Sequence, residues 1–230
     1  MNGTKEQETI WKDMKNEHKH MMVYAGAGTG KTYTIVEGAK LIGGKKGFLC
    51  FNKGIQQELD KKLPADCNAM TFHSLGLSSV KMKNRAAKVD FKKNYNIIKT
   101  LLGAKYKSAS ALNKLIGLLK SSMADWTDRK QISDIIDKYN IEFDGLIDER
   151  EAIEFLPTIK ELCMDISIVD YDDMIWLPVV LDLPVKHYDV LFVDEAQDFN
   201  EVQRRLILKS CNGKNDSCWR PKTSHLWFSR

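Results

Sequence analysis

Short apolar runs alternate with amphipathic stretches along the first quarter of the chain. Residues 6–15 have helical character without glycine or proline, and the apolar run Met21–Tyr24 is short enough for a buried strand. Residues 32–41 predict a second helix, which two glycines end, and residues 47–51 predict a second buried strand. This order of strand, loop, helix and strand is typical of an α/β fold with a parallel sheet flanked by helices.

The pattern changes in the middle of the chain. Between residues 75 and 181, Leu, Ile and Lys recur at helical spacing with hardly any glycine, which predicts a mostly helical insertion. Another short apolar run, residues 188–193, resumes the sheet and ends directly in two acids. We therefore expect an α/β core at residues 1–75 and 185–213, a helical insertion subdomain at 76–184, and a separate tail at 214–230.

Composition narrows the class of protein. The 230 residues are 43% hydrophobic, which is enough for one or two cores without disulfides or metals, and the five cysteines show no spacing suited to zinc. The N-terminus lacks a signal pattern, and no apolar run approaches the ~20 residues that a membrane span requires. We therefore expect a cytoplasmic or nuclear protein without a membrane partner.

Charge is unevenly distributed although the net value is only +4. Residues 81–107 contain nine Lys or Arg (81, 83, 85, 88, 92, 93, 99, 105 and 107) against one acid, Asp90. Such a stretch is either a solvated helix face or a surface for nucleic-acid phosphates, whose contacts are sensitive to salt.

The sharpest motif lies between the first strand and the next helix, and its residues are Ala25, Gly26, Ala27, Gly28, Thr29, Gly30, Lys31 and Thr32. Glycines let successive backbone N–H groups turn towards phosphate oxygens, and the helix N-terminus adds partial positive charge. The pattern predicts a phosphate loop in which Lys31 reaches the β- and γ-phosphates of a nucleotide and Thr32 binds Mg²⁺. The general pattern opens with glycine, so Ala25 marks a variant form.

A second motif follows the apolar run at residues 190–193, where the chain reads Asp194, Glu195, Ala196, Gln197 and Asp198. Open α/β sheets bind ligands at the C-terminal ends of their strands. Asp194 is suited to hold Mg²⁺ through water, and Glu195 is suited to accept a proton from an attacking water molecule.

Together these motifs resemble the UvrD/Rep-type superfamily 1 DNA helicases, which move along single-stranded DNA using ATP. The resemblance covers the chain to about Gly213 and implies a RecA-like P-loop NTPase core. Residues 4–7 are similar to a motif in which glutamine reads adenine, which implies that Gln7 favours ATP. By the same resemblance Gln197 senses the γ-phosphate, so Lys31, Glu195 and Gln197 are the expected catalytic residues, with ATP and Mg²⁺ as ligands.

Two shorter segments resemble the parts of that family that touch the single strand: Phe51, Asn52 and Lys53, and then Thr71, Phe72 and His73. The family more often has threonine at the position of Phe51, so a hydroxyl contact is lost and a stacking surface remains. For Phe72, core packing and stacking are equally good interpretations. Single-stranded DNA is the expected partner, and RNA stays open.

Residues 214–230 show neither strand nor helix periodicity, and we expect a flexible tail. The family's third motif, Gly-Asp-Pro-x-Gln, is missing after Asp198. One permitted back-translation of the tail, read one nucleotide out of frame, gives Lys-Met-Ile-Ala-Val-Gly-Asp-Pro-Lys-Gln. We therefore hypothesise a frameshift near Gly213 or Lys214. The coding DNA tests this: a different set of codons through the tail, or no helicase-like reading frame downstream of it, would exclude the frameshift.

The expected function is an ATP-binding motor domain of a single-stranded-DNA translocase or helicase. We expect weak turnover and no unwinding by the chain alone, because the family's second lobe supplies arginines that this chain lacks. Two alternatives stay open: a nucleic-acid-binding or regulatory module that uses ATP only for stability, and another P-loop enzyme such as a kinase. The sequence indicates no oligomeric state.

Overall fold

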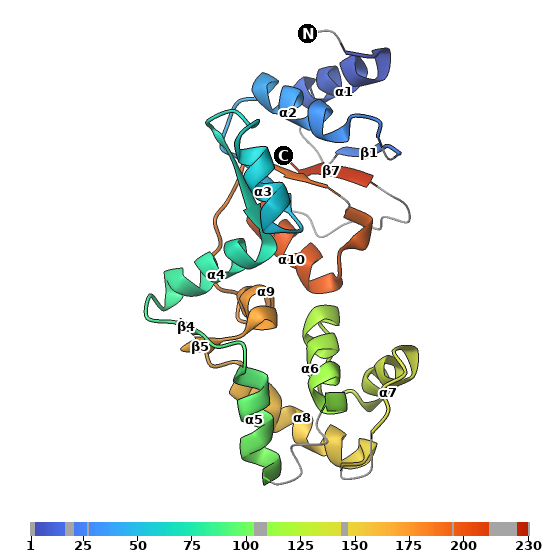
Figure 1. The fold of residues 1–230 in the computed structure, drawn as a ribbon, viewed down its shortest axis with the longest axis vertical. Helices are drawn as coiled ribbons and strands as arrows, with labels where there is room; N and C mark the ends of the chain where they lie inside the picture. The colour runs from blue at the N-terminus through green and yellow to red at the C-terminus, as the bar shows by residue number, and fades with distance from the viewer. Residues whose placement is uncertain are drawn as a thin grey trace. The chain divides into compact units, whose positions relative to one another are not determined.

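A computed structural model of the chain describes residues 3–16, 21–26, 28–103, 110–143, 147–194, 196–211 and 225–229 (Figure 1). The chain divides into two compact units, and each is described by itself. The first unit comprises Met1–Leu75, Val185–Phe199 and Arg204–Arg230, and the second comprises Gly76–Pro184 with Asn200–Gln203.

The first unit contains a five-stranded sheet, with strands β1 (Met21–Tyr24), β2 (Lys46–Cys50), β3 (Cys67–Thr71), β6 (Val190–Val193) and β7 (His225–Ser229). Their order is β1-β7-β6-β2-β3. β2 pairs in parallel with β3 and β6, and Phe48 aligns with Ala69 and Phe192. β7 is antiparallel to both β1 and β6. Hence β1 and β6 run in the same direction, and their C-terminal ends lie at the same edge of the sheet.

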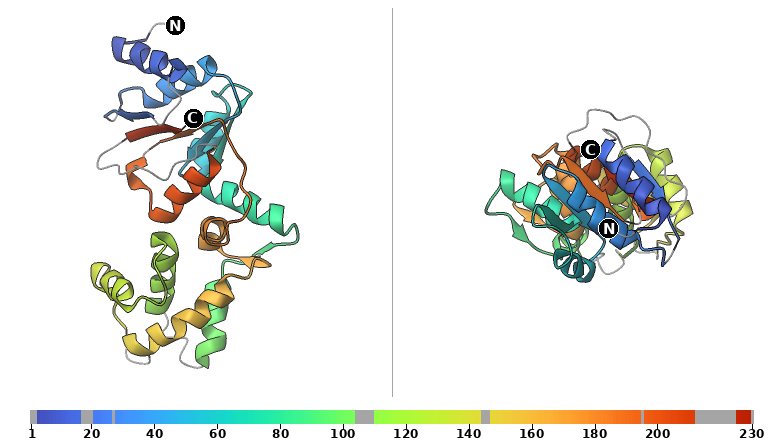
Figure 2. Two further views of the ribbon diagram at one scale, coloured as in Figure 1. Left: turned by 180° about the vertical axis from the view of Figure 1, so that it is seen from behind. Right: turned by 90° about the horizontal axis from the view of Figure 1, so that it is seen from above.

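Helices α1 (Lys5–Asn16) and α2 (Lys31–Leu41) pack together against the sheet (Figure 2). Their apolar side chains, including those of Trp11 and Ile35, form one buried cluster with Phe48 and Phe192 of the sheet. Each fully buried side chain of this size stabilises the fold by roughly 1.5–3 kcal/mol. The predicted α/β fold, with a loop between a strand and a helix, is therefore confirmed, although Met21, Met22 and Val23 of that strand are half-buried and not buried as expected.

Lys46 in β2 caps the C-terminal end of α2, the helix that follows the predicted phosphate loop. Its side chain is buried, and its ammonium group donates to the carbonyl oxygens of Ala39 at 2.8 Å and Ile42 at 2.6 Å. The carboxylate of Asp66 lies 2.6 Å from the same ammonium group. The last carbonyls of a helix have no intrahelical partner, so this lysine supplies donors that would otherwise be missing.

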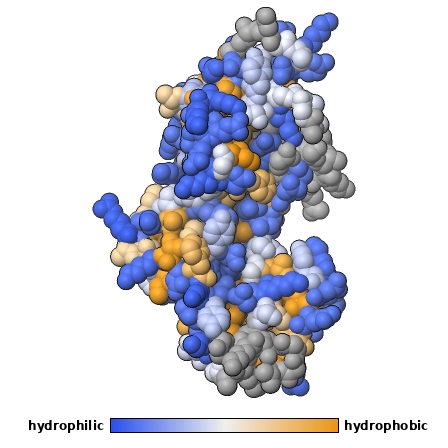
Figure 3. Space-filling model, viewed as in Figure 1, coloured by the Kyte–Doolittle hydropathy of each residue, from blue (hydrophilic) through white to orange (hydrophobic). Residues whose placement is uncertain are grey.

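The second unit is mostly helical: α4 (Phe72–Lys83, whose first turn belongs to the first unit), α5 (Lys93–Leu102), α6 (Ser110–Ser122), α7 (Arg129–Lys138), α8 (Glu149–Cys163) and α9 (Tyr171–Val180). It also contains a parallel pair of short strands, β4 (Lys88–Val89) and β5 (Ile168–Val169). Sequence periodicity did not indicate this pair, because two residues are too few to show alternation. Figure 3 shows hydrophobic side chains, in orange, on the drawn face of this unit. Among the exposed aromatic residues of the unit, Phe91 is 71% exposed.

Two buried lysines and two buried aspartates join helices of the second unit. Lys93 Nζ lies 2.6 Å from Asp173 Oδ2, and Lys120 Nζ lies 2.7 Å from Asp173 Oδ1 and 3.2 Å from Asp170 Oδ2. Among the described residues, Asp173 Oδ1 has no hydrogen-bond partner of good geometry, so its ion pair with Lys120 is what offsets its burial. Burial acts to lower the pKa of Lys120, but these carboxylates outweigh it and raise the pKa.

The structure differs from the sequence prediction in the tail. No regular element was expected after Lys214, whereas residues 225–229 form β7 between β1 and β6. A strand between two open backbone edges is stabilised by hydrogen bonds on both sides, which requires no amphipathic periodicity. The expectation of a wholly flexible tail is therefore wrong for these five residues.

The described helices fall short of the requirements of a membrane span. None of them combines the length and the apolar character that crossing a bilayer would need.

Candidate nucleotide site

The predicted phosphate loop connects the end of β1 to the start of α2. Gly28 and Gly30 have φ angles of 75° and 80°, a conformation that glycine adopts without the steric cost of a side chain. A Cβ atom at Gly28 would meet no atom within 4 Å, so this backbone faces open space. Gly30 precedes α2 as its N-cap residue and makes no side-chain hydrogen bond to that end of the helix. Ala27 lies outside the described residues.

Lys31 and Thr32 form the first turn of α2. Lys31 is half-buried and lines a pocket beside the loop, whereas Thr32 is exposed and does not line that pocket. The lysine therefore lies at this pocket, whereas Thr32 lines a separate hollow with Tyr33, Val36, Glu37, Lys40 and Lys62.

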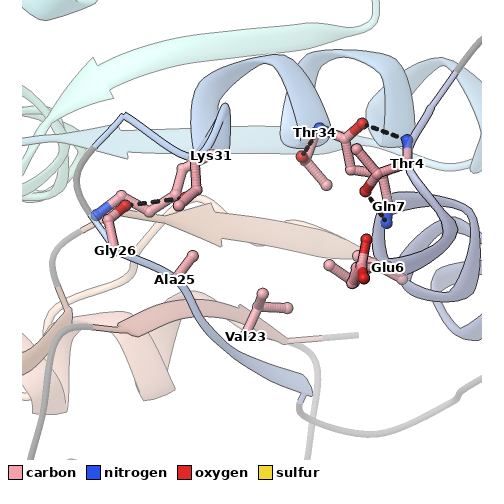
Figure 4. A pocket seen from close by; sticks show the side chains of 10 residues that line it. Thr4, Glu6, Gln7, Val23, Ala25, Gly26, Lys31 and Thr34 are labelled. Carbon is pink, nitrogen blue, oxygen red and sulfur yellow. Dashed lines mark hydrogen bonds between the residues drawn. The ribbon is translucent and has the colours of Figure 1, made fainter.

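The pocket has a volume of about 400 Å³, within the range of small-molecule sites. Its lining residues come from α1, β1, the loop and α2, and they are Thr4, Glu6, Gln7, Ile10, Val23, Ala25, Gly26, Thr29, Lys31 and Thr34. Figure 4 shows Lys31 and Gln7 on opposite sides of this space, with Ala25 and Val23 along its floor. Six of these ten residues are polar or charged, and Ile10, Val23 and Ala25 add apolar wall. The space suits a flat ring at the side of Gln7 and an anion at the side of Lys31.

Hydrogen bonds fix the side-chain amide of Gln7. Its oxygen accepts from the backbone N–H of Thr4 at 3.0 Å, and its nitrogen donates to the hydroxyl of Thr34 at 3.1 Å. Because a backbone N–H can only donate, this arrangement also assigns which end of the amide is oxygen. Gln7, which was predicted from the four-residue motif at residues 4–7, is thus held at the pocket by two hydrogen bonds.

Acidic residues follow β6 at the same edge of the sheet. Asp194 is half-buried and comes directly after Val193, which pairs with Leu49 of β2. Burial raises the pKa of the Cys50 thiol to about 12, and the carboxylates of Asp60 and Asp194 add to the rise, so Asp194 lies near the end of β2. Gln197 is half-buried in the short 3-10 helix η2 (Ala196–Asp198). Glu195 lies outside the described residues.

No group of three or more His, Cys, Asp or Glu side chains suited to a metal ion occurs among the residues that the structure describes. A nucleotide site of the kind predicted here needs fewer protein ligands, because phosphate oxygens and water complete the coordination of Mg²⁺. Of the two Mg²⁺ ligands predicted from the sequence, Thr32 is exposed and Asp194 is half-buried.

The first predicted strand-contact segment follows β2. Phe51 is 43% exposed, and Lys53 is exposed at the start of helix α3 (Lys53–Asp60). The side-chain oxygen of Asn52 accepts from the backbone N–H of Ile55 at 2.9 Å, so Asn52 caps α3. All three residues are exposed, but the side chain of Asn52 is engaged in the cap.

The second predicted segment follows β3. Thr71 and Ser74 exchange hydrogen bonds between side chain and backbone, at 3.0 Å and 3.1 Å, and thereby cap α4. The ring of Phe72 is only 2% exposed and packs in the core. Burial lowers the pKa of His73 to about 4, so its imidazole is neutral at pH 7. A contact of His73 with phosphate would therefore be that of a neutral donor.

Sequence reasoning missed Phe199, which follows the acidic motif. Its ring centroid lies 5.5 Å from that of Phe51 and 5.0 Å from that of Phe72. The available signal was its position, since an aromatic residue directly after a strand-end acidic motif lies near the other strand ends.

Comparison with protein families gives a match over most of the chain. A family model described as an AAA domain matches residues 7–215. The matched region begins at Gln7 and includes the phosphate loop, the acidic residues after β6 and the whole helical unit.

Proposed function

Because the chain belongs to the AAA domain family, we propose that it is the ATP-binding motor domain of a translocase or helicase acting on single-stranded DNA. AAA domains of the P-loop type typically bind ATP with Mg²⁺. The observation that carries the proposal is the pocket with Gln7 on one side and Lys31 on the other. An amide at one side of the pocket and a cation at the other suit a base and its phosphates.

Each residue of the site has a role set by its chemistry. The amide of Gln7 would recognise the edge of adenine, and the loop N–H groups with Lys31 would hold the phosphates. Thr32 and Asp194 would hold Mg²⁺, which offsets phosphate charge when bound. Glu195 would take the proton of the attacking water, and Gln197 would respond to the γ-phosphate.

We expect slow hydrolysis by this chain alone. Lys31 is the one cation among the described residues that line the pocket. Phosphoryl transfer is accelerated strongly when further cations, commonly arginines, stabilise the charge of the transition state. A partner that supplies such a cation would therefore raise the rate.

The strand would pass over the end of β2, where Phe51 and Lys53 offer an aromatic face and a cation. Exposed side chains of the basic stretch are suited to phosphate contacts: Lys81, Lys83, Arg85, Lys88, Lys92 and Lys99. Lys93 is excluded from that role because it is buried in the ion pair with Asp173. Lys105 and Lys107 lie outside the described residues.

Equilibrium binding and hydrolysis of Mg²⁺-ATP test the proposal. Lys31→Ala should abolish binding, whereas Lys40→Ala should not, because Lys40 lies on the same helix and pairs with Glu37 at the surface. Glu195→Gln should retain binding and remove the remaining turnover. Strand binding by a chain that binds no ATP would contradict the proposal and favour a nucleic-acid-binding module.

A further inference from the structure

Three phenylalanine rings form a continuous series from the surface to the core of the first unit. Phe51 is 43% exposed, Phe199 is half-buried and Phe72 is 2% exposed. The rings of Phe51 and Phe199 are tilted by 30° with centroids 5.5 Å apart, and Phe72 meets Phe199 edge-on at 69° and 5.0 Å. Both distances fall within the favourable range for aromatic pairs.

The three rings come from the ends of three neighbouring strands. Phe51 follows β2, Phe72 follows β3, and Phe199 follows β6 through η2. Because β2 pairs in parallel with β3 and β6, these ends meet at one edge of the sheet. Phe199 therefore connects the acidic segment after β6 to both predicted strand-contact segments.

We propose that Phe199 is a positioning residue that holds the exposed ring of Phe51 for stacking with an unpaired base and links that ring to the Asp194–Asp198 segment. This inference rests on the proposed function, because it assumes that the end of β2 meets a nucleic-acid strand. A base can stack on Phe51 because that ring is open on the surface, and Lys53 lies two residues away for the phosphate.

Holding the ring in place raises affinity because less conformational freedom is lost on binding. The ring of Phe199, tilted by 30°, packs against Phe51, and the buried ring of Phe72 contacts Phe199 from the core. Phe199 thus acts through Phe51 and needs no contact with the strand.

The same residue provides a physical route between the nucleotide site and the strand. Ala196 is fully buried and anchors η2, whose next residues lead to Phe199. A rearrangement of Asp194 or Gln197 around a bound nucleotide would change the position of Phe199, and with it the ring of Phe51.

Binding of a labelled oligothymidylate to the full chain, with and without a non-hydrolysable Mg²⁺-ATP analogue, tests this inference. Phe199→Leu and Phe51→Leu should each weaken strand binding by roughly five- to tenfold. The double variant should be no weaker than Phe51→Leu, because Phe199 acts through that ring. Phe199→Tyr keeps an aromatic ring and should bind the strand as the unaltered chain does.

Tyr139→Leu is a matched control, because Tyr139 is a 42% exposed aromatic residue on the surface of the second unit, just beyond α7. It should leave strand binding unchanged, and all variants should bind the nucleotide analogue normally. Phe199→Leu should also remove the effect of the nucleotide on strand affinity. Should Phe199→Leu fail to fold, Phe199→Met, which is unbranched and adaptable, takes its place in the same cycle.

The outcomes separate this inference from the function on which it rests. Losses that add in the double variant, or strand binding unaffected by Phe199→Leu, would overturn the inference and leave the proposed function intact. Absence of strand binding by the unaltered chain would overturn the proposed function and, with it, this role of Phe199.

Discussion

The side-chain amide of Gln7 donates a hydrogen bond of 3.1 Å to the hydroxyl of Thr34. That hydroxyl donates in turn to the carbonyl oxygen of Gly30 at 3.0 Å. Trp11 of α1 adds a second connection, because its indole N–H donates to the carbonyl oxygen of Thr34 at 2.8 Å. Thr34 therefore connects the helix that carries Gln7 to the helix that follows the phosphate loop.

Replacing Thr34 by valine should reduce discrimination between ATP and GTP. Valine has nearly the same shape but cannot accept the hydrogen bond from Gln7, so the amide loses its fixed orientation at a cost of about 1 kcal/mol, or about fivefold in selectivity. Thr34→Ser keeps the hydroxyl and should retain the selectivity. Calorimetric dissociation constants for the two nucleotides provide the measurement, and equal selectivity in the valine variant would contradict this role.

Removing the ammonium group of Lys46 should destabilise the first unit. Lys46→Met leaves the carbonyl oxygens of Ala39 and Ile42 without their donor in a buried place, at an expected cost of about 2–3 kcal/mol in the free energy of unfolding. Urea denaturation measures the change. Lys40→Met, which removes an exposed pair with Glu37, should cost no more than about 0.5 kcal/mol. Similar decreases in the free energy of unfolding for the two variants would show that the buried cap stabilises the fold no more than the exposed ion pair does.

Strand β7 yields a prediction that depends only on the backbone. Residue 227 lies between Met22 of β1 and Val193 of β6 in the register. Trp227→Pro removes a ladder hydrogen bond and should lower stability by about 3 kcal/mol relative to Trp227→Val, which keeps the N–H group. Equal melting temperatures for these two variants would mean that the strand does not form in solution.

The strand, loop and helix at the start of this fold could be predicted from the sequence, because the residues that indicate them are adjacent in the chain. The run 21–24, the glycine-rich loop and the helix after it follow one another directly, so their order predicted the α/β fold and the edge of the sheet that carries the loop. Features that depend on distant residues could not be predicted. Lys93 belongs to a basic stretch, yet it is buried because Asp173, 80 positions away, lies 2.6 Å from it.

The tail and the aromatic cluster also depend on residues that are distant in the sequence. β7 lies between β1 and β6, and residues 225–229 alone do not indicate with which strands they would pair. Likewise, Phe199 meets Phe51 and Phe72 only because three parallel strands end at one edge.

His73 should make stability depend on pH between about 6.5 and 4. Burial lowers the pKa of His73 to about 4 in the folded chain, from an ordinary value of 6.5. Between these values the unfolded chain binds a proton that the folded chain does not, so the free energy of unfolding falls as pH decreases through this window. His73→Gln should reduce the difference in urea stability between pH 7 and pH 5. An unchanged difference would show that His73 is not desolvated in the folded chain.

The affinity of the unaltered chain for a single-stranded oligonucleotide, measured with and without a non-hydrolysable Mg²⁺-ATP analogue, tests the central claim most directly. A motor domain must couple its two ligands, and that coupling is reciprocal. We predict a change in the strand dissociation constant of at least about fivefold on nucleotide binding, and no change in Lys31→Ala. An identical dissociation constant in the two conditions, with the nucleotide shown to be bound, would contradict the account.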